Sequence, residues 1–222
     1  LYLDGLEDAY SPGKLMGVFA EEAAVAYQFS REAQDAYAVE SLTRARRAVE
    51  TGAFKREIAA VEVSTRKGTE VVDTDEAPLK ADLAKIPTLK PAFSRDGTVT
   101  AANSSSLSDG AAALVITRAS VAERLGLSVV ARIVAHAAHA HEPGLFTTAP
   151  VPAIQKVLAK AGWSVGDVDL FEVNEAFAVV AMIAMKELSI PHDRININGG
   201  ACALGHPIGA SGARILATLL SA

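Results

Sequence analysis

The second half of the chain alternates between short apolar runs and helical patterns, and this alternation limits the folds that it can adopt. The runs are rich in Val, Ile, Ala and Leu, which is typical of buried strands, and a helical spacing of apolar residues follows each one. Such an order favours an α/β domain with crossover helices. We expect strands at 111–117, 129–138, 167–173 and 194–198, and helices at 119–126, 150–163, 174–188 and 210–222.

The first part of the chain is mostly helical. Residues 14–50 predict two helices. The second of these begins after Ser30, a good N-cap, and ends at Gly52, which suits the left-handed position after a helix.

A β-hairpin and a long irregular segment follow these helices. The hairpin has expected strands at 58–65 and 69–72, joined by a turn at Lys67–Gly68. Residues 73–97 contain prolines and show no periodicity, so we expect a long surface excursion there. The composition changes near residue 107, which we take as the boundary between a loop-rich helical part and an α/β part.

Composition excludes several classes of partner. Half of the 222 residues are hydrophobic, so the chain can bury a sizeable core. The formal net charge is −5 and no basic run would follow a phosphate backbone, so we expect no nucleic acid partner. No apolar run reaches the length of a membrane span, and the single cysteine excludes an internal disulfide and suits a reducing compartment.

Both ends of the sequence indicate a piece of a longer chain. It starts LYLDGLEDAY without an initiator Met, and it stops at ARILATLLSA inside an apolar helical pattern. We therefore do not assign a cytoplasmic or organellar location from the missing targeting sequence.

A glycine-rich stretch, NGGACALGHPIGASG, occupies residues 198–212 between an expected strand and an expected helix. Its backbone amides could form an anion or oxyanion site, or the glycines could simply allow a tight connection. His206, held between Gly205 and Pro207, has a near-neutral pKa that suits a general base. Cys202 stands four residues earlier and is either its nucleophile or a bystander.

Three further groups of residues carry alternative interpretations. Asn174, between an expected strand and helix, could cap the helix or hold a water or substrate oxygen, and Glu175 could favour the helix dipole. His136, His139 and His141 have spacings that suit a metal, but few acids and no cysteine flank them, so we expect no metal site. Lys80, Lys85 and Lys90, in the excursion that also carries Phe93, could bind phosphates and a purine or belong to a solvated loop.

Taken together, several of these stretches resemble the thiolase family. NGGACALGHPIGASGARI is similar to the family's histidine motif, VNEAFA to its asparagine motif, and GTVTAANSSSLSDGAAALV to its CoA-side segment. MGVFAEEAAVAYQFSREAQDAYAVES resembles the helices of its loop domain, and the match is nearly collinear over the whole chain. The small-residue motif GHPIGASG looks most like that of the biosynthetic acetyl-CoA acetyltransferases.

The resemblance implies a thiolase fold, a layered α/β/α architecture with a mostly helical loop domain and an incomplete C-terminal α/β half. It places the loop domain, which covers CoA, at residues 1–107. Residues 108–126 would end the N-terminal half, and 127–222 would form a truncated C-terminal half. It also implies a homotetramer built from dimers, with no metal and no cofactor beyond the CoA thioester substrates.

The activity implied by the resemblance is the reversible condensation of two acetyl-CoA molecules to acetoacetyl-CoA and CoA. In the family, a cysteine attacks the first thioester and a second cysteine moves the α-proton. The resemblance places these cysteines in segments that would precede Leu1 and follow Ala222. It gives His206 the role of base and Asn174 the role of holding a water, so that imidazole and water form an oxyanion hole.

The resemblance also implies binding residues for CoA and the acyl group. Phe146, in HEPGLFTTAPVPA, would line the acyl pocket. Cys202 occupies a position that is usually aliphatic in the family, so we expect a small buried hydrophobe there. Contacts to CoA would come from Met16, Lys80, Lys85, Phe93, Ala101 and Ser105.

The chain departs from the family pattern at three positions. Leu15 replaces a common His before Met16, and Leu42 stands where potassium-sensitive members have Tyr. Lys80 replaces a commoner Arg, which weakens bidentate binding. Two alternatives to the acetyltransferase stay open: an inactive CoA-binding protein of thiolase ancestry, and a thioester hydrolase that uses Cys202 and His206.

Overall fold

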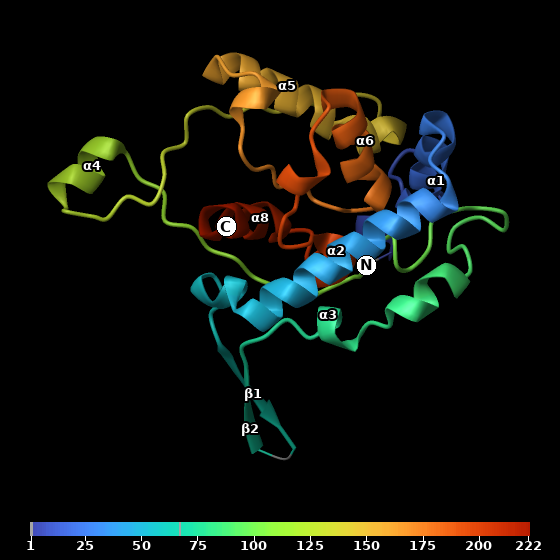
Figure 1. The fold of residues 1–222 in the computed structure, drawn as a ribbon, viewed down its shortest axis with the longest axis horizontal. Helices are drawn as coiled ribbons and strands as arrows, with labels where there is room; N and C mark the ends of the chain where they lie inside the picture. The colour runs from blue at the N-terminus through green and yellow to red at the C-terminus, as the bar shows by residue number, and fades with distance from the viewer. Residues whose placement is uncertain (1, 67) are drawn as a thin grey trace.

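The long helix α2 (Arg31–Thr51) runs through the middle of the molecule, and its two ends are those predicted from the sequence (Figure 1). The Ser30 hydroxyl accepts a hydrogen bond from Ala33 N at 3.1 Å, and Gly52 adopts a left-handed φ of 74°. A side-chain oxygen at the N-cap satisfies one of the free amides of the first turn, and glycine tolerates positive φ without a steric cost. Both ends are therefore set by local chemistry.

The computed structural model describes residues 2–66 and 68–222. The other α-helices are α1 (Met16–Tyr27), α3 (Ala77–Lys80), α4 (Ala119–Arg124), α5 (Pro150–Ala161), α6 (Ala178–Leu188), α7 (Ala201–Leu204) and α8 (Ser211–Ser221). Shorter helical turns are η1 (Tyr2–Leu6), η2 (Ala53–Arg56), η3 (Leu83–Thr88), η4 (Pro143–Thr148), η5 (Val165–Asp167) and η6 (His192–Arg194). The strands β1 (Val61–Thr65) and β2 (Gly68–Val72) form an antiparallel hairpin, with Val61 opposite Val72.

The core is built around α6, which packs against α1, α2, α5 and η4. Ala178, Val179, Ala181, Ile183 and Ala184 of this helix are all fully buried. A helix that is apolar on every face is stable only when other elements surround it. The predicted helices at 14–50, 119–126, 150–163 and 210–222 are also confirmed in outline.

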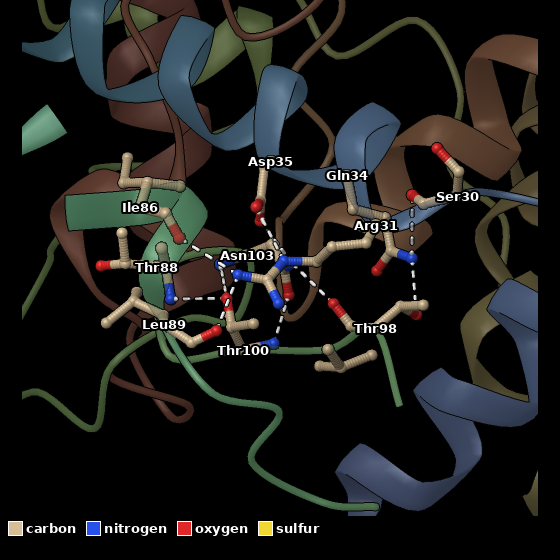
Figure 2. Close-up of polar contacts among 12 residues, drawn as sticks. Ser30, Arg31, Gln34, Asp35, Ile86, Thr88, Leu89, Thr98, Thr100 and Asn103 are labelled. Carbon is tan, nitrogen blue, oxygen red and sulfur yellow. Dashed lines mark hydrogen bonds and ion pairs between the residues drawn. The ribbon is translucent and has the colours of Figure 1, made fainter. Parts of the chain in front are cut away.

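The irregular excursion after the hairpin is fixed to α2 by a buried polar network (Figure 2). Arg31 Nε lies 2.7 Å from an oxygen of Asp35, and the same guanidinium donates to the carbonyls of Ile86 and Leu89 at 3.1 and 2.9 Å. Asp35 also accepts from Asn103 Nδ2 at 3.1 Å. Arg31 therefore links α2 to the start of segment 86–103, and Asp35 links it to the end.

Two of the predicted strands are wrong. Residues 111–117 and 129–138 contain no strand, and their apolar side chains are exposed: Val115 is 95% exposed and Val130 is 72% exposed. A strand needs the hydrogen-bonding groups of a neighbouring strand, and within residues 2–66 and 68–222 these two segments have none.

The other two predicted strands are not formed either, and their segments meet only at one isolated bridge. Phe171 and Ile195 form an isolated parallel bridge. Phe171 N donates to Arg194 O at 2.7 Å, and Asn196 N donates to Phe171 O at 2.9 Å. The chain is therefore parallel at this one bridge, but the strand predicted at 194–198 is wrong, because Asn196 has a positive φ of 47° and residues 197–198 form a turn.

The hairpin and α4 project from the body of the molecule (Figure 1). The hairpin confirms the predicted strands approximately, while Lys67 of the predicted turn lies outside the described residues. None of the helices in the described ranges is long and apolar enough to span a bilayer.

Candidate functional site

Asn174 is placed by an extended segment, 174–177, that hydrogen-bonds to a neighbouring chain segment before α6 begins. Ser105 N donates to Ala176 O at 3.1 Å, and Ala178 N donates to Asn103 O at 2.8 Å. These bonds hold the backbone extended, so α6 starts at Ala178 and not at Asn174. The helix-cap interpretation of Asn174 is therefore wrong, and its side chain is free for another task.

His206 is placed by the end of the glycine-rich loop. Its backbone N donates to Ser106 O at 3.0 Å, in an isolated parallel bridge between Leu107 and His206. Gly205 precedes it with a φ of +93°, and a Cβ there would lie 2.0 Å from Ser108 Oγ. Glycine is required at this position because both the backbone angle and the close approach exclude a side chain.

The structure brings Asn174 and His206 together. Asn174 Nδ2 lies 3.3 Å from His206 Nε2, although the two residues are 32 positions apart. The same amide nitrogen lies 3.5 Å from His206 Nδ1, which in turn lies 2.5 Å from the buried Ser211 Oγ. Ser211 Oγ also donates to Pro207 O at 3.1 Å, so this hydroxyl fixes the Nδ1 end of the imidazole.

Sequence reasoning missed Ser211. Its position in the first turn of α8, five residues after His206, was the available signal. A hydroxyl there can reach back to a preceding carbonyl and to a side chain in the loop before the helix.

Electrostatics favour a neutral His206. Burial lowers the pKa of this half-buried imidazole, and the positive charge of Arg214 lowers it further. A neutral ring can accept a proton, as a general base must. Next to it, Asn174 Oδ1 is buried and makes no hydrogen bond with the residues that the structure describes. An acceptor of this kind suits a group that holds a water or a substrate donor.

Cys202 has the environment of a packed thiol and not of a nucleophile. Its Sγ lies 3.9 Å from the backbone oxygen of Glu175, and the side chain packs against the main core. Burial raises its pKa well above the ordinary value, and the Glu175 carboxylate raises it further. A thiol that stays protonated is a poor nucleophile, so the structure does not support a Cys202–His206 hydrolase.

Three of the predicted binding residues share one aromatic cluster beside Asn174. Met16, Phe93 and Phe146 pack with Phe177, and the ring centres of Phe93 and Phe146 lie 5.9 and 6.4 Å from that of Phe177. A Cβ on Gly17 would lie 2.3 Å from the Phe93 ring, so glycine lets this ring lie against α1. Met16, Phe93 and Phe146 therefore meet at Phe177, on the same short segment, 174–177, that carries Asn174.

The remaining predicted residues lie at different distances from this pair. Ser105 adjoins it, because its Oγ donates to Ala176 O at 2.9 Å. Ala101 is exposed. Lys80 is exposed and paired with Glu76, and Lys85 is exposed and lies 3.7 Å from Asp82. Neither lysine is brought to His206 by the contacts that the structure describes.

An open groove of about 460 Å³ adjoins the histidine loop. It is lined by residues 108–112 on one side and 207–210 on the other. One of its sides thus begins at Pro207, directly after His206 in the sequence.

Two of the three histidines of HAAHAH, His139 and His141, contact each other, and His139 also contacts a cation. His139 Nε2 lies 3.2 Å from His141 Nδ1, and Lys156 Nζ lies 2.9 Å from His139 Nδ1. Within the described residues, no group of three or more metal-ligating side chains is placed to hold a metal ion.

Comparison with known proteins identifies the family. The thiolase N-terminal domain matches residues 1–120, and the thiolase C-terminal domain matches residues 127–222. An acetyl-CoA acetyltransferase of Thiocystis violacea is 47% identical over 222 residues, which are 99% of this chain and 56% of that protein. The chain belongs to the thiolase family.

Solved structures agree with this assignment. The structure of the Bacillus anthracis acetyl-CoA acetyltransferase matches with a TM-score of 0.93 at 40% identity, over 97% of this chain and 55% of that one. The structure of human mitochondrial 3-ketoacyl-CoA thiolase matches with a TM-score of 0.89 at 37% identity, over 97% and 54% of the two chains. The thiolase fold is thus confirmed, and the chain spans a little over half the length of these relatives.

Proposed function

We propose that these residues form part of an acetyl-CoA C-acetyltransferase, which condenses two acetyl-CoA molecules to acetoacetyl-CoA and CoA and catalyses the reverse thiolysis. The observation that carries the proposal is the pairing of the Asn174 amide with the His206 imidazole at 3.3 Å, beside the aromatic cluster. The names of the relatives supply the substrate class.

The chemistry of thioester attack fits these two side chains. A neutral imidazole can take the proton of a thiol, which becomes a good nucleophile only as the thiolate. Attack on the thioester builds negative charge on the carbonyl oxygen. The imidazole N–H and a water held by Asn174 would stabilise that charge in a site shielded from bulk water.

Other parts of the reaction are assigned to residues around the pair. The nucleophilic and proton-shuttling cysteines belong to segments outside residues 1–222. Met16, Phe93 and Phe146 would contact the pantetheine and acyl groups, with Ala101 and Ser105 on the same side. Lys80 and Lys85 would bind the phosphates of CoA, and the intact protein would assemble as a homotetramer and need no metal and no cofactor beyond its thioester substrates.

The test uses the product of the complete reading frame that contains these residues, hereafter the full-length protein. Purified full-length protein should consume acetoacetyl-CoA in the presence of CoA and release acetyl-CoA, and it should form acetoacetyl-CoA from acetyl-CoA alone. His136→Ala changes an exposed histidine and should leave both rates unchanged.

The same assay addresses the second candidate function. Tight binding of CoA with no thiolysis of acetoacetyl-CoA, or of longer 3-ketoacyl-CoA substrates, would contradict the acetyltransferase. That result would favour a CoA-binding protein without acyl-transfer chemistry.

A further inference from the structure

Glu175, next to Asn174, is the centre of a buried hydrogen-bonding cluster that the reaction chemistry above does not use. Its carboxylate is fully buried. One oxygen accepts from Tyr37 Oη at 2.8 Å and Asn196 Nδ2 at 2.9 Å. The other accepts from Ser41 Oγ at 2.8 Å and Cys202 N at 3.0 Å. The helix expected at 174–188 begins only at Ala178, so Glu175 does not lie in its first turn; its carboxylate accepts instead from a first-turn amide of α7.

These partners come from three segments that are far apart in the sequence. Tyr37 and Ser41 lie one turn apart on α2, Asn196 follows the extended segment that ends near Ile195, and Cys202 is in α7. The carboxylate thus joins the long helix of the first part of the chain to both segments that carry the site.

The glycine pair before α7 allows this close approach. A Cβ on Gly200 would lie 2.3 Å from the Glu175 carboxyl carbon. Gly199 has a φ of +79°, and a Cβ there would lie 2.4 Å from Ser41 O. Gly200 N also donates to Ser41 Oγ at 3.0 Å. The loop before α7 therefore packs closely against Glu175 and α2.

The hydrogen-bonding cluster requires a carboxylate at position 175. A buried carboxylate is stable only when hydrogen bonds replace its hydration, and here each oxygen receives two donors. The hydroxyls of Tyr37 and Ser41 can rotate, but Asn196 Nδ2 and Cys202 N are N–H donors that face opposite oxygens. A glutamine has only one acceptor oxygen, so its NH₂ group must face one of these two donors.

We propose that Glu175 is a positioning residue, which sets the spacing between the Asn174 amide and the His206 ring by tying segment 174–177 to α7 and α2. Asn174 directly precedes Glu175, and His206 follows α7 after Gly205. A shift of about 1 Å between such groups can cost on the order of 100-fold in rate. The expected effect of Glu175 on the reaction rate rests on the proposed function. Its effect on the geometry of Asn174 and His206 does not.

The first measurement is an NMR titration of the His206 ring in the full-length protein, comparing wild type with Glu175→Gln. In the wild type, burial and Arg214 lower the pKa of His206. In Glu175→Gln the loop opens, and we expect the His206 pKa to rise toward its ordinary value of about 6.5. Loss of stability alone would leave the titration of the folded molecules unchanged, so this readout separates positioning from a structural role.

The second measurement is kinetic and uses the full-length protein. We expect Glu175→Gln to lower kcat for thiolysis by about 100-fold with a change in KM of less than about threefold. The matched control is Glu172→Gln, three residues earlier, because burial raises the pKa of Glu172 to about 8 and this side chain is already mostly neutral at pH 7. Glu172→Gln should have the wild-type kcat and the wild-type pKa of His206.

Tyr37→Phe decides the question if Glu175→Gln does not fold. This variant removes the Tyr37 hydroxyl that donates to Glu175 and keeps the aromatic ring and the carboxylate. We expect a smaller rise in the His206 pKa and a smaller fall in kcat than in Glu175→Gln. A wild-type titration and a wild-type kcat in folded variants would overturn the proposal. If wild-type full-length protein shows no thiolysis, the proposed function fails, and the His206 titration still decides whether Glu175 positions the ring.

Discussion

At the scale of single residues, the site depends on what orients one imidazole. Asn174 Nδ2 lies 3.3 Å from His206 Nε2, and Ser211 Oγ lies 2.5 Å from His206 Nδ1. A ring held by two such contacts loses little conformational entropy when a substrate binds. This arrangement gives Ser211 a measurable effect on catalysis, although it does not contact the acyl group in the proposed mechanism.

Ser211→Ala removes the hydroxyl that holds His206 Nδ1. We expect kcat for thiolysis by the full-length protein to fall about 10-fold, because the ring samples unproductive orientations. The control is Ser94→Ala, which changes an exposed serine in the excursion and should keep the wild-type rate. Equal rates for both variants would contradict the orienting role of Ser211.

The raised pKa of Glu172 makes the stability of the folded protein depend on pH. Burial raises its pKa from 4.5 to about 8, so the unfolded chain releases this proton at lower pH than the folded chain. The folded state therefore loses stability as pH rises from about 4.5 to 8, and no further above that range. Between pH 5 and pH 9 this amounts to about 4 kcal/mol.

Urea unfolding of the chain at pH 5 and pH 9 measures this effect. Glu172→Gln cannot ionise and should lack the loss that the wild type shows between the two pH values. Parallel changes in the free energy of unfolding of both proteins would contradict a raised pKa.

At the scale of elements, the excursion after the hairpin is held by the network of Arg31, Asp35 and Asn103 (Figure 2). Arg31→Ala removes the donors to Ile86 O and Leu89 O and leaves Asp35 buried without its cation. We expect a loss of about 2–3 kcal/mol of stability and faster amide hydrogen exchange in residues 83–100.

The matched control for Arg31→Ala is Lys85→Ala, on the same excursion. Lys85 is exposed and its ion pair with Asp82 is 3.7 Å long, so the change should stay within about 0.5 kcal/mol. Unchanged exchange in residues 83–100 of Arg31→Ala would show that other contacts hold the excursion.

The elements also show which parts of the fold could be predicted from the sequence. The ends of α2 follow from Ser30 and Gly52, whose side-chain and backbone preferences act within a few residues. The strands expected at 111–117 and 129–138 failed, because an apolar run indicates burial but does not supply the partner that a strand needs. The motif residues Asn174 and His206 could be found by resemblance, whereas the role of Glu175 depends on Tyr37, 138 positions away.

At the scale of the whole molecule, the described chain exposes apolar side chains on the segments around α4. Val115, Ile116 and Val130 are 95%, 67% and 72% exposed. Extended apolar segments with unpaired backbone groups associate readily with other chains. We expect the 222-residue chain, produced alone, to self-associate at concentrations where the full-length protein stays in one defined assembly.

Analytical ultracentrifugation of the isolated chain tests this expectation. A double variant, Ile116→Lys with Val130→Lys, should reduce the self-association, while Val25→Lys, at a 77% exposed position on α1, should have little effect. A monomeric wild-type chain would contradict the expectation that these segments drive the association.

The central claim is that Asn174 and His206 form an acyl-transfer site in which His206 acts as the base. The most direct test is mass spectrometry of the full-length protein after incubation with acetyl-CoA, in wild type, His206→Ala and the exposed control His136→Ala. We expect a covalent acetyl-enzyme in wild type and His136→Ala, and none in a folded His206→Ala. Normal acetylation of His206→Ala would contradict the claim.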